Sequence, residues 1–175
     1  MVEKMKKNSG FTLVELIVAV ALFAIVIGPL FQAFSSSIKA NSRARGVLKA
    51  TQLAESVLDN VERSNAKALK DDIDYDDLGA TLLPPGISNA TVSASRTTVN
   101  VDEVRIEFYH VSYADLVVNV KIEISKKATV NTNTSNKYFM YAADVYVYMD
   151  KGTSVGNYFV GDPLAHLTGS VQNIE

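Results

Sequence analysis

Residues 10–38 read GFTLVELIVAVALFAIVIGPLFQAFSSSI, and Glu15 carries the only charge among them. The 23 residues from Leu16 to Ile38 are uncharged, which exceeds the roughly 20 that an α-helix needs to cross a bilayer. A carboxylate inside such a segment costs about 3 kcal/mol and is rarely left without a partner. The stretch therefore predicts a membrane-spanning helix with one acidic group that must be neutralised.

A basic leader precedes this stretch. Residues 1–10 read MVEKMKKNSG, in which three lysines outweigh Glu3. Because a basic flank stays on the cytoplasmic side, we expect the amino terminus inside the cell and the rest of the chain outside. An ordinary secretory signal has its small residues after the apolar stretch, whereas Ser9 and Gly10 stand before it.

The order of basic leader, glycine, aromatic residue and apolar run, with a carboxylate at the fifth position after the glycine, is a specific pattern. The stretch GFTLVELIVA, Gly10 to Ala19, resembles the prepilin leader of type IV pilins and of the pseudopilins of type II secretion and competence systems. The resemblance implies that a prepilin peptidase cuts after Gly10 and methylates the new amino group of Phe11. Loss of residues 1–10 would change the formal charge from −2 to −4, since 14 basic and 18 acidic residues would remain.

The resemblance also assigns a role to Glu15. Cleavage creates a cationic amine on Phe11, one helical turn from Glu15, and pairing the two charges removes most of their desolvation penalty. In the family the carboxylate serves the amine of a neighbouring subunit, so slipped registers would leave charges unpaired. Glu15 is thus predicted to set the assembly register with other pilin subunits, and an assembly platform protein and an ATPase are implied as further partners.

Gly28-Pro29 interrupts the apolar run. Proline removes an intrahelical hydrogen bond and clashes with the preceding turn, at a cost of about 3 kcal/mol in a helix interior. We expect a kink or local melting there. In the family such a pair can unwind in the filament, while membrane helices also tolerate a proline as a passive kink.

Residues 39–68 are predicted to be the amphipathic half of the same helix, after a transmembrane or filament-core half at 11–38. Apolar residues recur at helical spacing on one face, at Val47, Ala50, Thr51, Leu53, Ala54, Val57, Leu58 and Val61. The stretch ATQLAESVLDNV also resembles minor pilins and minor pseudopilins. The basic residues Lys39, Arg43, Arg45 and Lys49 are interpreted as a solvated face, with a basic collar at the outer membrane surface or a subunit contact as the alternatives.

Residues 69–175 are predicted to form a globular, β-rich head. Strands are expected at Val104 to Val111, Leu116 to Ser125 and Tyr138 to Met149, with an edge strand at Thr91 to Val99. In the second of these, alternating residues predict one dry and one wet sheet face. A polar loop is expected at 126–137, and a loop at 152–175. The fold class is α+β: a long N-terminal helix packed on a small antiparallel sheet, sharing one core.

No residue pattern indicates an enzyme or a bound cofactor. The chain has no Cys, and its two histidines, His110 and His166, belong to no metal or triad motif. Asp72, Asp74 and Asp76 imitate the start of a Ca²⁺ loop, but Asp77 and Leu83 stand where an EF-hand needs glycine and glutamate. The acidic balance also disfavours nucleic-acid binding.

The sequence thus indicates a type IV pilus-like filament subunit, a minor pilin, that spans the cytoplasmic membrane once before assembly and then lies in an extracellular or periplasmic filament. Three alternatives stay open. One is a pseudopilin of type II secretion or competence. The others are a signal-anchored surface binding protein or enzyme that never polymerises, and a DNA-uptake receptor.

Overall fold

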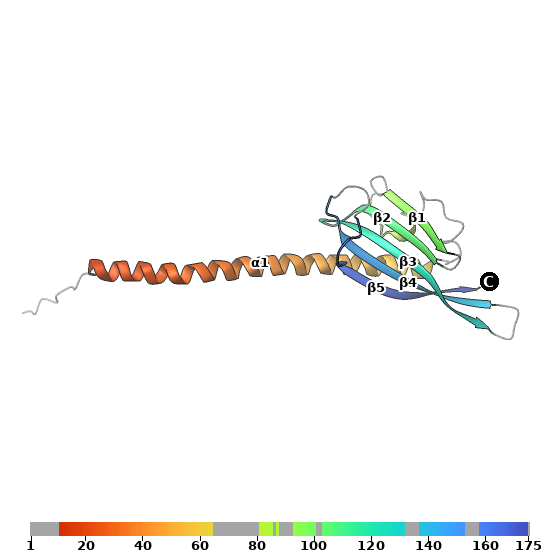
Figure 1. The fold of residues 1–175 in the computed structure, drawn as a ribbon, viewed down its shortest axis with the longest axis horizontal. Helices are drawn as coiled ribbons and strands as arrows, with labels where there is room; N and C mark the ends of the chain where they lie inside the picture. The colour runs from red at the N-terminus through yellow and green to blue at the C-terminus, as the bar shows by residue number, and fades with distance from the viewer. Residues whose placement is uncertain are drawn as a thin grey trace, which may run out of the picture. The chain divides into compact units, whose positions relative to one another are not determined.

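The computed structural model describes residues 11–64, 81–85, 87, 93–100, 103–131, 137–152 and 158–174. One long helix, α1 (Leu13–Arg63), is followed by five strands (Figure 1). They are β1 (Ser93–Asn100), β2 (Glu103–Tyr113), β3 (Leu116–Asn131), β4 (Lys137–Met149) and β5 (Ala165–Ile174). The predicted α+β fold, a long N-terminal helix with an antiparallel sheet, is confirmed.

The chain divides into an N-terminal unit, Met1–Arg43, and a C-terminal unit, Ala44–Glu175, and α1 contributes to both. In the N-terminal unit α1 continues through Pro29 without a break. Local melting at Gly28-Pro29 in an assembled state stays a prediction. The helix was predicted to extend to Ala68; its described end is Arg63, and residues 65–68 lie outside the described residues.

In the C-terminal unit α1 buries one face. The buried positions are Gly46, Ala50, Leu53, Ala54, Val57 and Val61, which confirms most of the predicted stripe. Val47 differs, because its side chain is 43% exposed. At 100° per residue, Ala50 and Val57 lie at the centre of the buried stripe and Val47 lies at its border, so burial of Val47 is incomplete.

The sheet has the order β1-β2-β3-β4-β5, and every neighbouring pair is antiparallel. This is a simple meander, in which each strand pairs with the next along the chain. The β2–β3 turn is the two-residue Ala114-Asp115, with Ala114 at φ 56°. The strands predicted at Val104 to Val111, Leu116 to Ser125, Tyr138 to Met149 and Thr91 to Val99 are all present, with somewhat different ends.

One hydrophobic core joins the helix to the sheet. Leu53, Val57 and Val61 of α1 belong to the same buried cluster as the inward residues of β2, β3 and β4. The inward residues are Val104, Ile106, Phe108 and Val111 on β2, Val118, Val120, Ile122 and Ile124 on β3, and Ala143, Val145 and Val147 on β4. On β3 their period of two matches the alternation expected from the sequence.

Two predicted loops were wrong. Residues 165–174, predicted as loop, form β5, because the backbone of Ala165–Ile174 pairs with β4 from Tyr138 to Val147. The polar segment 126–137 also belongs largely to strands, since β3 continues to Asn131 and β4 begins at Lys137. In both cases pairing with a neighbouring strand overrides a weak local β propensity.

The predicted wet face of β3 has one exception, Asn119, whose side chain is fully buried. Asn119 lies opposite a β-bulge: Phe108 pairs with Val120 and Val111 pairs with Val118, so Tyr109 and His110 together face Asn119. The bulge shifts the alternation by one residue, which lets Phe108 and Val111 both face the core.

Candidate functional site

The start of α1 is built as a capping box. Thr12 precedes the first helical residue, and its hydroxyl oxygen accepts a hydrogen bond from the Glu15 N–H at 3.3 Å. In return Glu15 Oε2 accepts from the Thr12 N–H at 3.0 Å and from the Thr12 hydroxyl at 3.2 Å. This reciprocal pair satisfies two backbone donors that a helix start otherwise leaves free.

The capping box gives Glu15 a partner within its own chain. Neutralisation of Glu15 by the amine of Phe11 stays a prediction, because Phe11 carries that amine only after cleavage. Phe11 itself is 90% exposed, and Gly10 lies outside the described residues. The pattern T-x-x-E before an apolar run is a recognised sequence sign of a helix start, so the role of Thr12 could have been found from sequence.

Beyond the cap, the apolar side chains of the N-terminal unit are largely exposed. Leu16, Phe23 and Phe31, for example, are 61%, 66% and 69% exposed. The helix is long and apolar enough to cross a membrane, with a mean hydropathy of 2.7 over its most apolar window and none of that window buried. An exposed apolar surface of this length requires either lipid or other apolar helices around it.

Gly28 and Pro29 lie within this exposed segment. Since Pro29 has no N–H, the carbonyl of Ile25 lacks its intrahelical donor. A Cβ added at Gly28 would meet nothing within 4 Å. The pair therefore weakens the helix locally, while the surrounding backbone stays helical.

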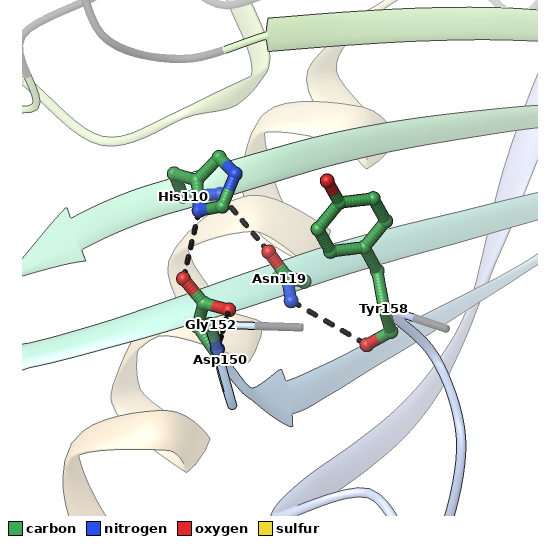
Figure 2. A network of polar contacts seen from close by, with 5 residues as sticks. All are labelled: His110, Asn119, Asp150, Gly152 and Tyr158. Atoms are coloured by element: carbon green, nitrogen blue, oxygen red, sulfur yellow. Dashed lines mark hydrogen bonds and ion pairs between the residues drawn. The ribbon is translucent and has the colours of Figure 1, made fainter. Parts of the chain in front are cut away.

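The head contains a second polar arrangement, around Asn119 (Figure 2). The Asn119 Oδ1 accepts from the His110 N–H at 2.9 Å, and its Nδ2 donates to the Tyr158 carbonyl at 3.4 Å. His110 Nδ1 lies 2.7 Å from Asp150 Oδ2, and Asp150 Oδ1 accepts from the Gly152 N–H at 2.9 Å. The network ties the β2 bulge to the segments that follow β4.

The charge on Asp150 is held by this network. Burial raises the pKa of its carboxyl, but hydrogen bonds from Gly152, His110 and Asn119 more than offset that effect, so the pKa lies below its usual value. Tyr158 and Phe159 then pack against Tyr109, with ring centroids 4.8 and 5.6 Å away. The arrangement thus ties Tyr158 and Phe159 to the β2 bulge.

The outer sheet face is polar and aromatic, and its side chains satisfy one another. Cross-strand register forms two rows, Arg105, Glu123, Asp144 and Thr168, and Glu107, Lys121, Tyr146 and His166. Glu123 pairs with Arg105 at 3.0 Å and with Lys121 at 3.2 Å. Tyr146 lies between Lys121 Nζ, 4.4 Å from its centroid, and the stacked ring of His166 at 4.2 Å.

Both histidines thus have carboxylate neighbours on the surface of the sheet. His166 Nε2 lies 3.1 Å from Asp144, which also accepts from the Thr168 hydroxyl at 2.6 Å. No group of three His, Asp or Glu residues suited to a metal occurs in the part of the chain that the structure describes. The predicted Ca²⁺ candidates Asp72, Asp74 and Asp76 lie outside that part.

The N-terminal part of the chain matches a known protein-family model. Residues 5–31 match the model of the prokaryotic N-terminal methylation motif. No match to the chain was found among curated proteins or among solved structures. The matched residues include Gly10, Phe11, the capping box and the first part of the exposed helix. The chain therefore carries the N-terminal motif of a prepilin-type substrate, on a helix consistent with a single-pass membrane anchor.

Proposed function

We propose that the chain is a structural subunit, a minor pilin, of a type IV pilus-like filament, and that it does no catalysis itself. One observation carries the proposal: the methylation motif at residues 5–31 lies on a helix whose apolar side chains are exposed from Leu13 to Ile38. Such a surface can be surrounded by lipid before assembly and by other helices afterwards. A simple anchor needs the first environment only, whereas a filament subunit needs both.

Processing is the first proposed step. The prepilin peptidase would cut the bond between Gly10 and Phe11, release residues 1–10 and methylate the new amine. The amine would then lie beside Thr12, whose N–H already donates to Glu15. Glu15 would thereby be within one helical turn of a cation as well as of its cap.

Assembly is the second proposed step. Glu15 can exchange part of its intrachain cap for the Phe11 amine of a neighbouring subunit, which fixes the axial height of the incoming helix. Extraction from the bilayer is feasible because apolar contacts with lipid are replaced by apolar contacts with other helices. A platform protein and an ATPase would supply the work.

The test of processing is an intact mass of the native protein. Loss of residues 1–10 together with a gain of about 14 Da on Phe11 is the expected result. A Gly10→Ile variant should keep the leader, and a Ser9→Ala variant serves as the matched control. A native mass that still includes residues 1–10 would refute the proposal at its first step.

The test of assembly uses Glu15→Val against Glu15→Gln. Both variants should be processed, since the cleavage site is intact, and both should be reduced in purified filaments because neither can pair with an amine. Normal incorporation of either variant would remove the register role. Deletion of the gene distinguishes a pilin from the alternative, a pseudopilin. Surface filaments are lost or shortened if the chain is a pilin, whereas protein export or DNA uptake fails if it is a pseudopilin.

A further inference from the structure

Two basic residues follow the apolar segment on α1 within the N-terminal unit, Lys39 and Arg43. Both side chains are exposed, and no ion pair joins either of them to a residue that the structure describes. Some other cations have a carboxylate partner, such as Arg63 with Asp59 at 2.8 Å and Arg105 with Glu123 at 3.0 Å. Lys39 and Arg43 thus have free positive charge next to an apolar surface.

Their spacing makes that charge unfavourable without an anion. Residues four apart on a helix are neighbours, and like charges there repel. Basic residues are also depleted from the outer flank of membrane helices, yet positions 39, 43, 45 and 49 are all basic. An anion that contacts Lys39 and Arg43 together would remove the repulsion.

Their height along the helix identifies where that anion lies. Lys39 follows Glu15 by 24 residues, or about 36 Å at 1.5 Å per residue, and Arg43 lies about 6 Å further. The hydrocarbon core is about 30 Å thick, and about 40 to 45 Å with both headgroup layers. With Glu15 at the inner boundary of the hydrocarbon core, Lys39 therefore lies in the outer headgroup layer, and Arg43 lies just outside it, where its long side chain can reach back to a headgroup.

A shallow apolar groove ends at Lys39. It has a volume of about 450 Å³ and is lined by Phe31, Phe34, Ser35, Ile38 and Lys39. Four of the five lining residues precede the cation on the membrane side, and three of these are large and apolar. The apolar wall of the groove and the cation of Lys39 at its end together match an amphiphile with an acyl chain and a negatively charged headgroup.

We propose that this surface binds an anionic phospholipid of the outer leaflet. Its phosphodiester contacts Lys39 and Arg43, and one acyl chain lies against Phe31, Phe34 and Ile38. The proposal rests only on the membrane-spanning part of the proposed function and not on cleavage or polymerisation. The bound lipid would fix the height of the subunit in the membrane, and it would have to leave before the helix is extracted.

The test uses the purified full-length chain in nanodiscs of phosphatidylglycerol and phosphatidylcholine, released into detergent, with retained lipid identified by native mass spectrometry. Enrichment of phosphatidylglycerol over phosphatidylcholine is expected. In Lys39→Gln/Arg43→Gln the enrichment should fall about 30-fold, because each cation near an anionic surface contributes about fivefold. Phe34→Ala should reduce retention of both lipids, because it shortens the apolar wall.

The matched control is Lys127→Gln/Lys151→Gln, which removes the same charge from exposed positions of the C-terminal unit and should retain the enrichment. Equal retention of the two lipids by the wild type overturns the proposal, as does unchanged enrichment in Lys39→Gln/Arg43→Gln. If that variant binds lipid normally but is lost from filaments, the cations contact a neighbouring subunit instead. Because the assay uses uncleaved, unassembled protein, failure of the filament proposal would leave its result intact.

Discussion

Thr12 shows how one side chain prepares Glu15 for its proposed role. The capping box satisfies the carboxylate inside its own chain, so the helix start is stable before any partner arrives. A carboxylate that is already oriented loses less conformational entropy when it meets an amine. The charge of Glu15 and its cost follow from the sequence, whereas the cap depends on Thr12, three positions earlier, whose hydroxyl and N–H meet Glu15 only once the first turn has formed.

We predict that Thr12→Ala loosens the first turn of α1. Loss of an N-cap side chain costs about 1 kcal/mol, which corresponds to roughly fivefold faster opening. Hydrogen exchange of the Leu16 amide, which donates to the Thr12 carbonyl, should accelerate by that factor in micelles. Thr12→Ser keeps the hydroxyl oxygen and should exchange like the wild type. Equal exchange in Thr12→Ala and the wild type would show that the cap does not hold the turn in solution.

A second prediction at this scale concerns Asn119. Removing the buried amide of Asn119 leaves the His110 N–H without its acceptor, at a cost of about 2 kcal/mol. Asn119→Ala should therefore lower the urea midpoint without changing the slope of the transition. Ser112→Ala, on the exposed face of β2, should leave the midpoint within error. An unchanged midpoint in Asn119→Ala would mean that water satisfies the bulge equally well.

At the scale of elements, the long, strongly patterned segments were predictable and the weakly patterned ones were not. β2 and β3 alternate β-branched or aromatic residues with polar ones, and β4 is rich in aromatic and β-branched residues, so their sequences alone indicate strands. Residues 165–174 have Gly169 in their middle and few β-branched residues, and only the ladder with β4 makes them a strand. The sequence carries no local trace of that long-range pairing.

Gly169 also explains how closely α1 approaches β5. A Cβ at this position would lie 2.8 Å from Leu58 Cδ1 and would also collide with the Glu62 carboxylate, which accepts from the Ser170 N–H at 3.3 Å. Gly169→Val should therefore cost about 2 kcal/mol through overpacking, seen as a lower urea midpoint. Ser170→Val, which points away from the helix, is the control and should cost less than a quarter as much. Similar losses in both variants would indicate that β-branched residues disturb β5 for another reason.

The link between β2 and the end of β4 makes a pH-dependent contribution to stability. Because hydrogen bonds hold the pKa of Asp150 below its unfolded value of about 3.9, its stabilisation is complete above that pH and disappears as pH falls through the folded pKa. The urea midpoint of the wild type should fall as the pH drops below about 4, and that of Asp150→Asn should fall less. Asp162→Asn, at an exposed carboxylate, should follow the wild type. Parallel curves for the wild type and Asp150→Asn would exclude this contribution.

For the whole molecule, the division at Arg43 and Ala44 separates the two environments that the chain needs. Among the residues that the structure describes, the buried core lies within Ala44–Glu175, while most apolar side chains from Phe11 to Ile38 are exposed. The sequence predicted both halves of α1 from the change in hydropathy, and it predicted that helix and sheet share one core. The depth of burial at Leu53 and Val57 required the sheet to be in place, so it could not be derived from the helix alone.

We therefore predict that residues 44–175, expressed without the N-terminal unit, are soluble and fold cooperatively. The fragment keeps the whole core, including the α1 residues that cover the sheet, and loses only exposed apolar surface. Its urea transition should be the same by far-UV circular dichroism and by near-UV tyrosine signals, as expected for two-state unfolding. A fragment from residue 69 onward should instead lack near-UV signal, since it would expose the sheet face that Leu53, Val57 and Val61 cover. If the 44–175 fragment were molten, or the 69–175 fragment native, the helix would not be an integral part of the core.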